Sequence, residues 1–379
     1  MVRRIMIFLV LIFIFICPTI TAFATNEEST LPEEYEDFIE SIPEDIAELL
    51  PEGLFENSPD GIINAVKELT DWEYILDYVF NIIGLNSKEI IKAFAILLSL
   101  LILCALLKMF KNTLNNSAIE CVVDLISGIT IVVSIMEICK APIESSMNLL
   151  NNMRIFVNSM SPTISAMYAM GGNLTSALVH NYGLIVFLSI LENICIIALE
   201  LILGLCMALT LSSVFVGNTD LLSLSNGIKK IFTSFWGIIM LVFTTVLSTQ
   251  SLLASKADSL SSKTAKMFAT QMIPLAGGTV GESLRTAGAS VEYLRSNVGV
   301  VLIVILVMLV APTLISISLY RLMFIVANAM ANLVGCEKEG RIIKEISSIY
   351  GYVLAILSVC AIILLFLITI FAKCASPMV

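Results

Sequence analysis

The sequence predicts an all-α polytopic membrane protein, and three observations support this fold class. Of the 379 residues, 58% are hydrophobic and only 14% are charged, whereas soluble domains average roughly 45–50% and 25%. The mean hydropathy is +0.96. Several apolar runs also reach the ~20 residues that one helical crossing requires. We therefore expect five to eight helical crossings, all in one membrane domain over residues 90–379.

The N-terminus has the pattern of an export signal. Arg3 and Arg4 precede a short apolar run, and an Ala-Phe-Ala cleavage site ends at Ala24. We expect residues 1–24 to be a cleavable signal peptide; the alternative is an uncleaved anchor helix. In either case the N-terminus from Thr25 onward would begin extracytoplasmic.

The net charge of −10 arises largely in one segment. Residues 27–60 hold thirteen carboxylates and no Lys or Arg, so the chain offers no basic face there, and we expect no nucleic acid partner. The extracytoplasmic segment 25–60 is consistent with a flexible tether or with short amphipathic helices that order on a partner. Residues 61–89 show an apolar stripe at helical spacing, which predicts an amphipathic helix at the membrane surface.

The membrane domain begins with a span from Ile90 to Phe110 that ends in Lys108 and Lys111, as is typical of a cytoplasmic end. A second span, 118–139, returns and is followed by a weakly amphipathic helix. The run 174–216 is about twice the length of one crossing, so it must bend, double back or lie partly at the membrane interface. Further apolar spans are predicted over 231–247, 298–334 and 352–371.

Two uncharged stretches share one pattern. Phe156–Gly172 reads FVNSMSPTISAMYAMGG and Phe268–Gly278 reads FATQMIPLAGG, so Phe, Met-x-Pro and Gly-Gly recur about 112 residues later. The basic entries at Lys230 and Lys344 recur at a similar offset of 114 residues. Matching offsets predict an internal duplication. Its halves lie near 118–217 and 230–335, with a truncated third unit over 344–372.

The repeated pattern also predicts helix breaks. Proline lacks a backbone donor and glycine pairs permit sharp turns, and at bilayer depth the freed groups are tolerated only inside protein or beside water. Such interruptions are the usual sequence pointer to a transport path. The alternative is a pair of surface turns at the outer headgroup level. The candidate interior helix-break residues are Pro162, Gly171, Gly172, Pro274, Gly277 and Gly278.

Ionisable residues within or beside apolar runs form a second set of candidates. A charge in the middle of the bilayer costs about 2.5–3.5 kcal/mol or more, so it should face protein, water or a cation. Glu192 and Glu200 are the best candidates for a functional interior, whereas Glu120 and Asp124 share one helical face near the start of a span. Arg321 is predicted to pair with one of the glutamates, to reach cytoplasmic lipid phosphates, or to reach the interface by snorkelling.

No pattern in the sequence predicts catalysis or cofactor binding. GxxxxGK[ST] and HExxH are absent, the nine cysteines form no CxxC pair, and His180 is the only histidine. Ser176 lies one helical turn before His180, and we interpret this pair as packing. We therefore expect no enzyme activity, no cofactor and no metal, with the cysteines acting as small packing residues.

Two segments carry a family resemblance: SKTAKMFATQMIPLAGGTVGESLRTAGASVEYLRSNVGVVLIVIL and ISISLYRLMFIVANAMANLVG. They resemble the stage III sporulation protein AE family of endospore-forming bacteria. The matching features are Thr-Ala-Lys before an aromatic residue, Ile-Pro followed by glycine, Asn-Val-Gly at the entry to a span, and Tyr-Arg-Leu. The secretory start, the acidic segment and the helix layout extend the resemblance over nearly the whole chain.

The resemblance implies a non-enzymatic subunit of a channel, or feeding-tube, apparatus between mother cell and forespore, needed for forespore development after engulfment. The protein would lie in the mother-cell membrane around the forespore. Its implied partners are an ATPase and ring-forming subunits on separate chains, together with the lipid bilayer; whether it forms a homo-oligomer is open. The residues alone leave two alternatives: a self-sufficient small-molecule transporter, or a scaffold that recruits partners through residues 26–87.

Overall fold

The computed structural model describes residues 33–40, 42, 50–54, 72–114, 117–170, 189–216, 221–239, 241–243 and 277–373, with a few more between 61 and 68 and between 245 and 249. The elements in these residues are helices. They are α2 (Glu33–Glu40), the 3-10 helix η2 (Glu52–Leu54), α5 (Trp72–Leu114), α6 (Ser117–Met170), the π-helix η3 (Leu201–Cys206), α8 (Met207–Val216), α10 (Gly277–Leu333) and α11 (Glu337–Lys373). Residues 189–200 and 221–239 are also helical.

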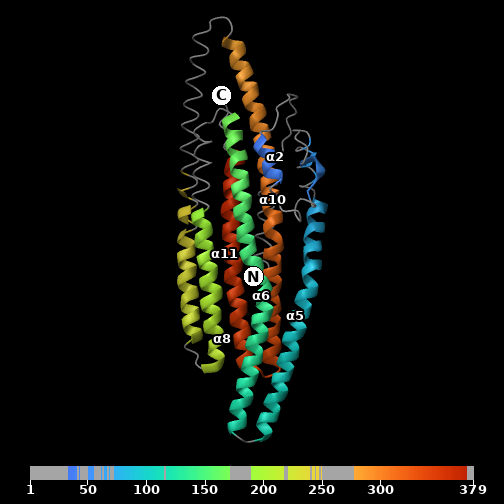
Figure 1. Ribbon diagram of the computed structural model, residues 1–379, viewed down its shortest axis with the longest axis vertical. Coiled ribbons are helices and arrows are strands. Elements are labelled where there is room, and N and C mark those ends of the chain that lie inside the picture. Colours follow the sequence, from blue (N-terminus) through green and yellow to red (C-terminus); the bar gives the residue numbers. More distant parts are fainter. Residues whose placement is uncertain are drawn as a thin grey trace.

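The long helices lie side by side and alternate in direction (Figure 1). In that view α5, α8 and α10 descend, while α6 and α11 ascend. Within the described residues, six helices are long and apolar enough to cross a membrane. This confirms the predicted all-helical, multi-pass fold. The six candidate spans are Leu76–Phe110, Leu125–Met170, Ser189–Ser213, Leu221–Phe243, Asn297–Leu333 and Glu337–Thr369.

Two predicted boundaries are absent from the structure. The segment predicted as a separate surface helix, residues 61–89, runs from residue 72 without a break into the first span, forming the 43-residue α5. The second span and the amphipathic segment after it likewise form one 54-residue helix, α6. No proline lies within α5, and α6 continues through both Pro142 and Pro162.

The structure differs from the sequence prediction at Pro162. This residue lies inside α6 with an exposed side chain, and the helix continues beyond it to Met170. An outward-facing ring near the end of a long, packed helix does not end that helix, since neighbouring turns are held by tertiary packing. Gly171 and Gly172, which follow Met170 directly, lie outside the described residues.

The second copy of the motif is described only at its end. α10 begins at Gly277, and Gly278 is its next residue, while Pro274 lies outside the described part. The internal duplication stays a prediction, because residues 268–276 of the second stretch, and Gly171 and Gly172 of the first, lie outside the described residues. The predicted signal peptide, 1–24, is outside them as well.

The turn between α10 and α11 is a compact glycine turn. Gly335 has a φ of 79°, and the Cys336 amide donates to the Ala331 carbonyl at 2.8 Å. Glycine adopts this left-handed conformation without steric cost. Just beyond the turn, Gly340 lets the two helices approach closely, because a Cβ there would be 3.0 Å from the Asn332 side chain.

The core lies between α6, α10 and α11, whose inward side chains are almost fully buried. Examples of fully buried side chains are Ile135, Met160, Val301, Phe324 and Leu357. Where burial removes apolar surface from water, it is the main favourable free-energy term that holds helices together. Within a bilayer, close packing of the side chains holds the helices together instead. The core therefore spans most of the length of the bundle.

Part of the acidic segment also packs on this core. In α2, Phe38 is 1% exposed and its ring meets that of Phe156 of α6 edge-on, with centroids 5.8 Å apart. Tyr35 is also buried, and burial raises the pKa of its hydroxyl. Of the two alternatives for residues 25–60, the described part favours short amphipathic helices, and α6 of the same chain is the surface on which α2 orders.

Candidate functional site

A buried ion pair joins two segments that are far apart in the sequence. The ammonium of Lys229 lies 2.7 Å from a carboxylate oxygen of Glu345 in α11. The Lys229 side chain is only 1% exposed. Because an isolated buried charge is strongly unfavourable, each of these groups depends on the other. The pair therefore fixes the helix at 221–239 against α11.

A second ion pair lies near the turn between α10 and α11. Lys108, close to the end of α5, contacts Glu339 at 2.8 Å. In the same region the Cys336 thiol donates to the Leu101 carbonyl at 3.7 Å. Lys108, which the sequence marks as part of a cytoplasmic end, and Lys229 are thus both bound by carboxylates from the first turns of α11.

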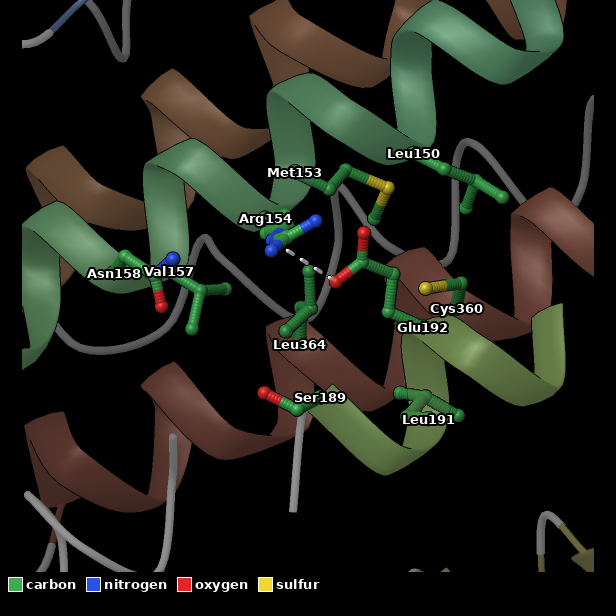
Figure 2. A pocket seen from close by; sticks show the side chains of 10 residues that line it. All are labelled: Leu150, Met153, Arg154, Val157, Asn158, Ser189, Leu191, Glu192, Cys360 and Leu364. Carbon is green, nitrogen blue, oxygen red and sulfur yellow. Dashed lines mark ion pairs between the residues drawn. The ribbon is translucent and has the colours of Figure 1, made fainter. Parts of the chain in front are cut away.

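The third ion pair lines a pocket between α6, the helix at 189–200 and α11. Arg154 Nε lies 3.6 Å from Glu192 Oε2, and the side chains are 59% and 15% exposed. Figure 2 shows the two side chains pointing toward each other from different helices. Glu192 thus has a protein partner in this membrane domain, as a carboxylate within an apolar helix requires.

The pocket has a mixed polar and apolar lining. Cys360 and Leu364 lie next to the ion pair, while Asn158, Ser189 and Leu191 lie farther from it (Figure 2). The pocket is open to the exterior, and the room inside it is about that of one water molecule. The thiols of Cys360 and Cys195 lie near each other, and both side chains are buried. A partly exposed guanidinium next to a carboxylate suits recognition of a small polar group.

The other predicted carboxylates occupy different places. Glu200 is exposed, so the interior position expected for it is not what the structure has. It directly precedes the π-helix η3, a type of distortion that is frequent at functional sites. Glu120 and Asp124 lie in the first two turns of α6, and their side chains are outside the described part.

The predicted pairing of Arg321 with a glutamate and its predicted snorkelling stay predictions, and the structure places its side chain between two helices. Its guanidinium lies against the backbone of α11, where a Cβ on Gly351 would be 2.8 Å from Cζ. Glu192, one of its two predicted partners, is paired with Arg154 instead. The hydroxyl of Ser347 donates to the Arg321 carbonyl at 3.5 Å. Arg321 is therefore part of the interface between α10 and α11.

Sequence reasoning missed several residues of these contacts. They are Arg154, Glu339, Glu345 and Gly351. Arg154 and Glu345 lie in segments that look amphipathic and polar, where a charged residue is ordinary, so a single sequence gives no signal that they pair. Among the described residues, no group of three or more His, Cys, Asp or Glu side chains is placed to hold a metal.

Comparison with known proteins places this bundle in a family. The family described as stage III sporulation protein AE matches residues 60–375. A stage III sporulation protein AE from Bacillus subtilis (strain 168) is 22% identical over 313 residues, which cover 81% of this chain and 77% of that protein. No solved structure matches the chain. Since the family match extends over most of the chain and takes in all six candidate spans, the protein belongs to the stage III sporulation protein AE family.

Proposed function

We propose that this protein is a non-enzymatic membrane subunit of the channel apparatus between mother cell and forespore, needed for forespore development after engulfment. One observation carries the proposal. The family match begins at residue 60 and ends at residue 375, so it coincides with the membrane bundle that runs from Leu76 to Thr369. The sporulation role thus attaches to the multi-pass part of the chain.

The contacts between helices support a subunit whose membrane domain acts as one body. Lys229 and Glu345 are 116 residues apart, and Lys108 and Glu339 are 231 residues apart. Ion pairs between segments so distant in the sequence hold the first and middle thirds of the chain in fixed register with the last third. Such a body suits a subunit that other chains contact on several sides.

The distribution of basic residues supports an orientation for this body. Lys230, Arg341 and Lys344 lie near the end of the bundle at which α10 meets α11, as does the Lys108 pair. Basic residues concentrate at cytoplasmic ends. The α10–α11 turn would then face the mother-cell cytoplasm. α2, nearer the other end in Figure 1, would face the space between the two membranes.

Isolation of the intact complex tests this function. The protein, tagged at its C-terminus and produced from its own gene, is extracted in mild detergent from sporulating cells after engulfment. We expect an ATP-hydrolysing protein and a ring-forming protein to be isolated with it. Another multi-pass protein of the same membrane, carrying the same tag, is the control. Isolation of the protein without either partner, under conditions that preserve its own fold, would count against the proposal.

The pocket at Arg154 and Glu192 favours a second candidate, a self-sufficient small-molecule transporter. If the pocket binds a solute, Arg154→Gln and Glu192→Gln should abolish spore formation at normal protein level, because this ion pair is partly exposed and contributes little to stability. Lys230→Gln, at an exposed position outside the pocket, is the matched control. Normal spore counts from both pocket variants would exclude the transporter and leave the subunit proposal intact.

A further inference from the structure

One side of α6 carries exposed charged and amide side chains. We call this set the α6 polar face; it consists of Glu137, Lys140, Glu144, Asn148 and Asn151. Glu137, Glu144 and Asn151 are seven residues apart, and the other two lie between them, so all five share one side of the helix. Closer to the start of α6 the exposed residues are apolar, among them Val122, Leu125, Ile126, Ile129 and Val133.

Two contacts fix the depth of the polar face in the bundle. Ser145, the residue after Glu144, lies 3.4 Å from Thr313 of α10 through the two hydroxyl oxygens. The carbonyl of Cys139 accepts a hydrogen bond of 3.5 Å from the hydroxyl of Tyr350 in α11. The polar face is therefore level with the surroundings of Thr313 and with the part of α11 that begins near Tyr350.

Two of the helices that pack on α6, namely α10 and α11, are free of charge at this level, whereas a third, α5, carries Lys88, Glu89 and Lys92. In α10 no charged residue occurs from Asn297 to Tyr320, a length of about 36 Å. In α11 none occurs from Ile346 to Ala372. Uncharged runs of this length match the hydrocarbon thickness of a bilayer. The α6 polar face is therefore at membrane depth, where exposed charges must face protein or water because lipid chains cannot solvate them.

We propose that the α6 polar face is the surface through which two copies of this chain associate in the membrane. Copies in one membrane share their orientation, so their α6 helices meet in parallel. Lys140 of one copy then lies between Glu137 and Glu144 of the other, since opposite charges alternate at one-turn spacing. Each Asn148 and each Asn151 both donates and accepts hydrogen bonds, so each can pair with its own counterpart.

The heptad spacing of the face supports a helix pair over a scattered polar surface. Residues that repeat every seven positions keep facing the partner along the whole contact. Ala141, exposed on the same side, has a small side chain that permits close approach of two backbones. This inference goes beyond the proposed function, because a channel-complex subunit can act as a single copy.

Photo-crosslinking in native membranes tests the association. It does not depend on thiol chemistry, so the cysteines of the chain stay in place. The photoreactive residue p-benzoylphenylalanine replaces Ala141 in full-length protein that carries either of two tags. We expect a crosslinked product that contains both tags. The control position is Ile197, which is 62% exposed on another helix and should give no product with both tags. A product of Ala141 with a protein of different size, or no product from either position, would overturn the proposal.

A charge swap between copies tests whether the α6 polar face pairs with a second copy or instead lines a water-filled path. Lys140→Glu makes the charged part of the face wholly acidic, and Glu137→Lys with Glu144→Lys makes it wholly basic. Each variant alone should lose the Ala141 product severalfold, whereas cells that produce both variants, with different tags, should regain it. Equal crosslinking in all three combinations contradicts the pairing. Isolation of the partner subunits with a variant that no longer crosslinks would leave the proposed function standing.

Discussion

The guanidinium of Arg321 in α10 lies where a side chain on Gly351 of α11 would be. A Cβ built on Gly351 would be 2.8 Å from Cζ and 3.0 Å from each terminal nitrogen of Arg321. Contacts below 3 Å force a shift, so glycine at this position is what admits the arginine between the two helices. The pair therefore couples a charged residue of one apolar helix to the backbone of the next.

We expect Gly351→Val to destabilise the protein by about 1–3 kcal/mol, because the added atoms overpack this interface. Gly227→Ala is the matched control, since no atom lies within 4 Å of a Cβ there. In the double variant with Arg321→Ala, the loss should be smaller than the sum of the single losses, because the overlap is removed. Thermal unfolding in detergent measures the four variants. Additive losses would show that Arg321 and Gly351 do not interact.

The Lys229–Glu345 pair should be the more sensitive of the two ion pairs near the start of α11. Lys229→Met leaves Glu345 without its partner in a buried site, at a cost of about 3–5 kcal/mol. Lys230→Met changes an exposed neighbour on the same turn and should have little effect. Protein level in membranes and thermal unfolding report the outcome. Equal stability of the two methionine variants would contradict the burial of Lys229.

The contact between Cys195 and Cys360 predicts an oxidative crosslink between the two halves of the chain. With a protease site inserted at residues 217–220, treatment with copper phenanthroline should keep the fragments together on a gel until reductant is added. Cys104 is replaced by Ser in this experiment, because it lies near Cys336 and spans the same cut. Cys360→Ser is the control and should release the fragments. Separation of the fragments from the protein that retains both Cys195 and Cys360 would show that the two helices are not in contact.

The orientation of the bundle predicts which residues are reached from outside the cell. Cysteines are introduced singly at Glu40 in α2 and at Glu337 at the start of α11, two exposed positions. Cys17, Cys121 and Cys374 are replaced by Ser. We expect an impermeant thiol reagent to label Glu40→Cys in intact cells that produce the protein outside sporulation, and Glu337→Cys only after permeabilisation. The opposite order would reverse the topology.

The sequence predicts the helical membrane fold because that outcome depends on the length and polarity of each run. A run such as 298–320 is uncharged and long enough to cross a bilayer in any context, so its state does not depend on the rest of the chain. Boundaries are less well predicted. Proline 162 suggests a break, but an exposed ring in a helix that packs along its length is tolerated. Tertiary packing thus overrides local propensity.

The partners of the charged residues could not be predicted from one sequence. Glu192 and Arg154 are 38 positions apart, and only the angle at which α6 passes the helix at 189–200 brings them together. The guanidinium of Arg321 lies beside Gly351, a residue that has no charge to signal the contact. Such pairings depend on how the helices are arranged in space, and a single sequence does not reveal that arrangement.

Deletion of the gene in its native bacterium tests the proposed role in sporulation most directly. Cells are followed by membrane staining through engulfment, and heat-resistant spores are counted in the deletion strain and in the same strain complemented with the intact gene. The account predicts that engulfment is completed, that forespore development then stops, and that complementation restores spores. Heat-resistant spores at the count of the parent strain would contradict the account.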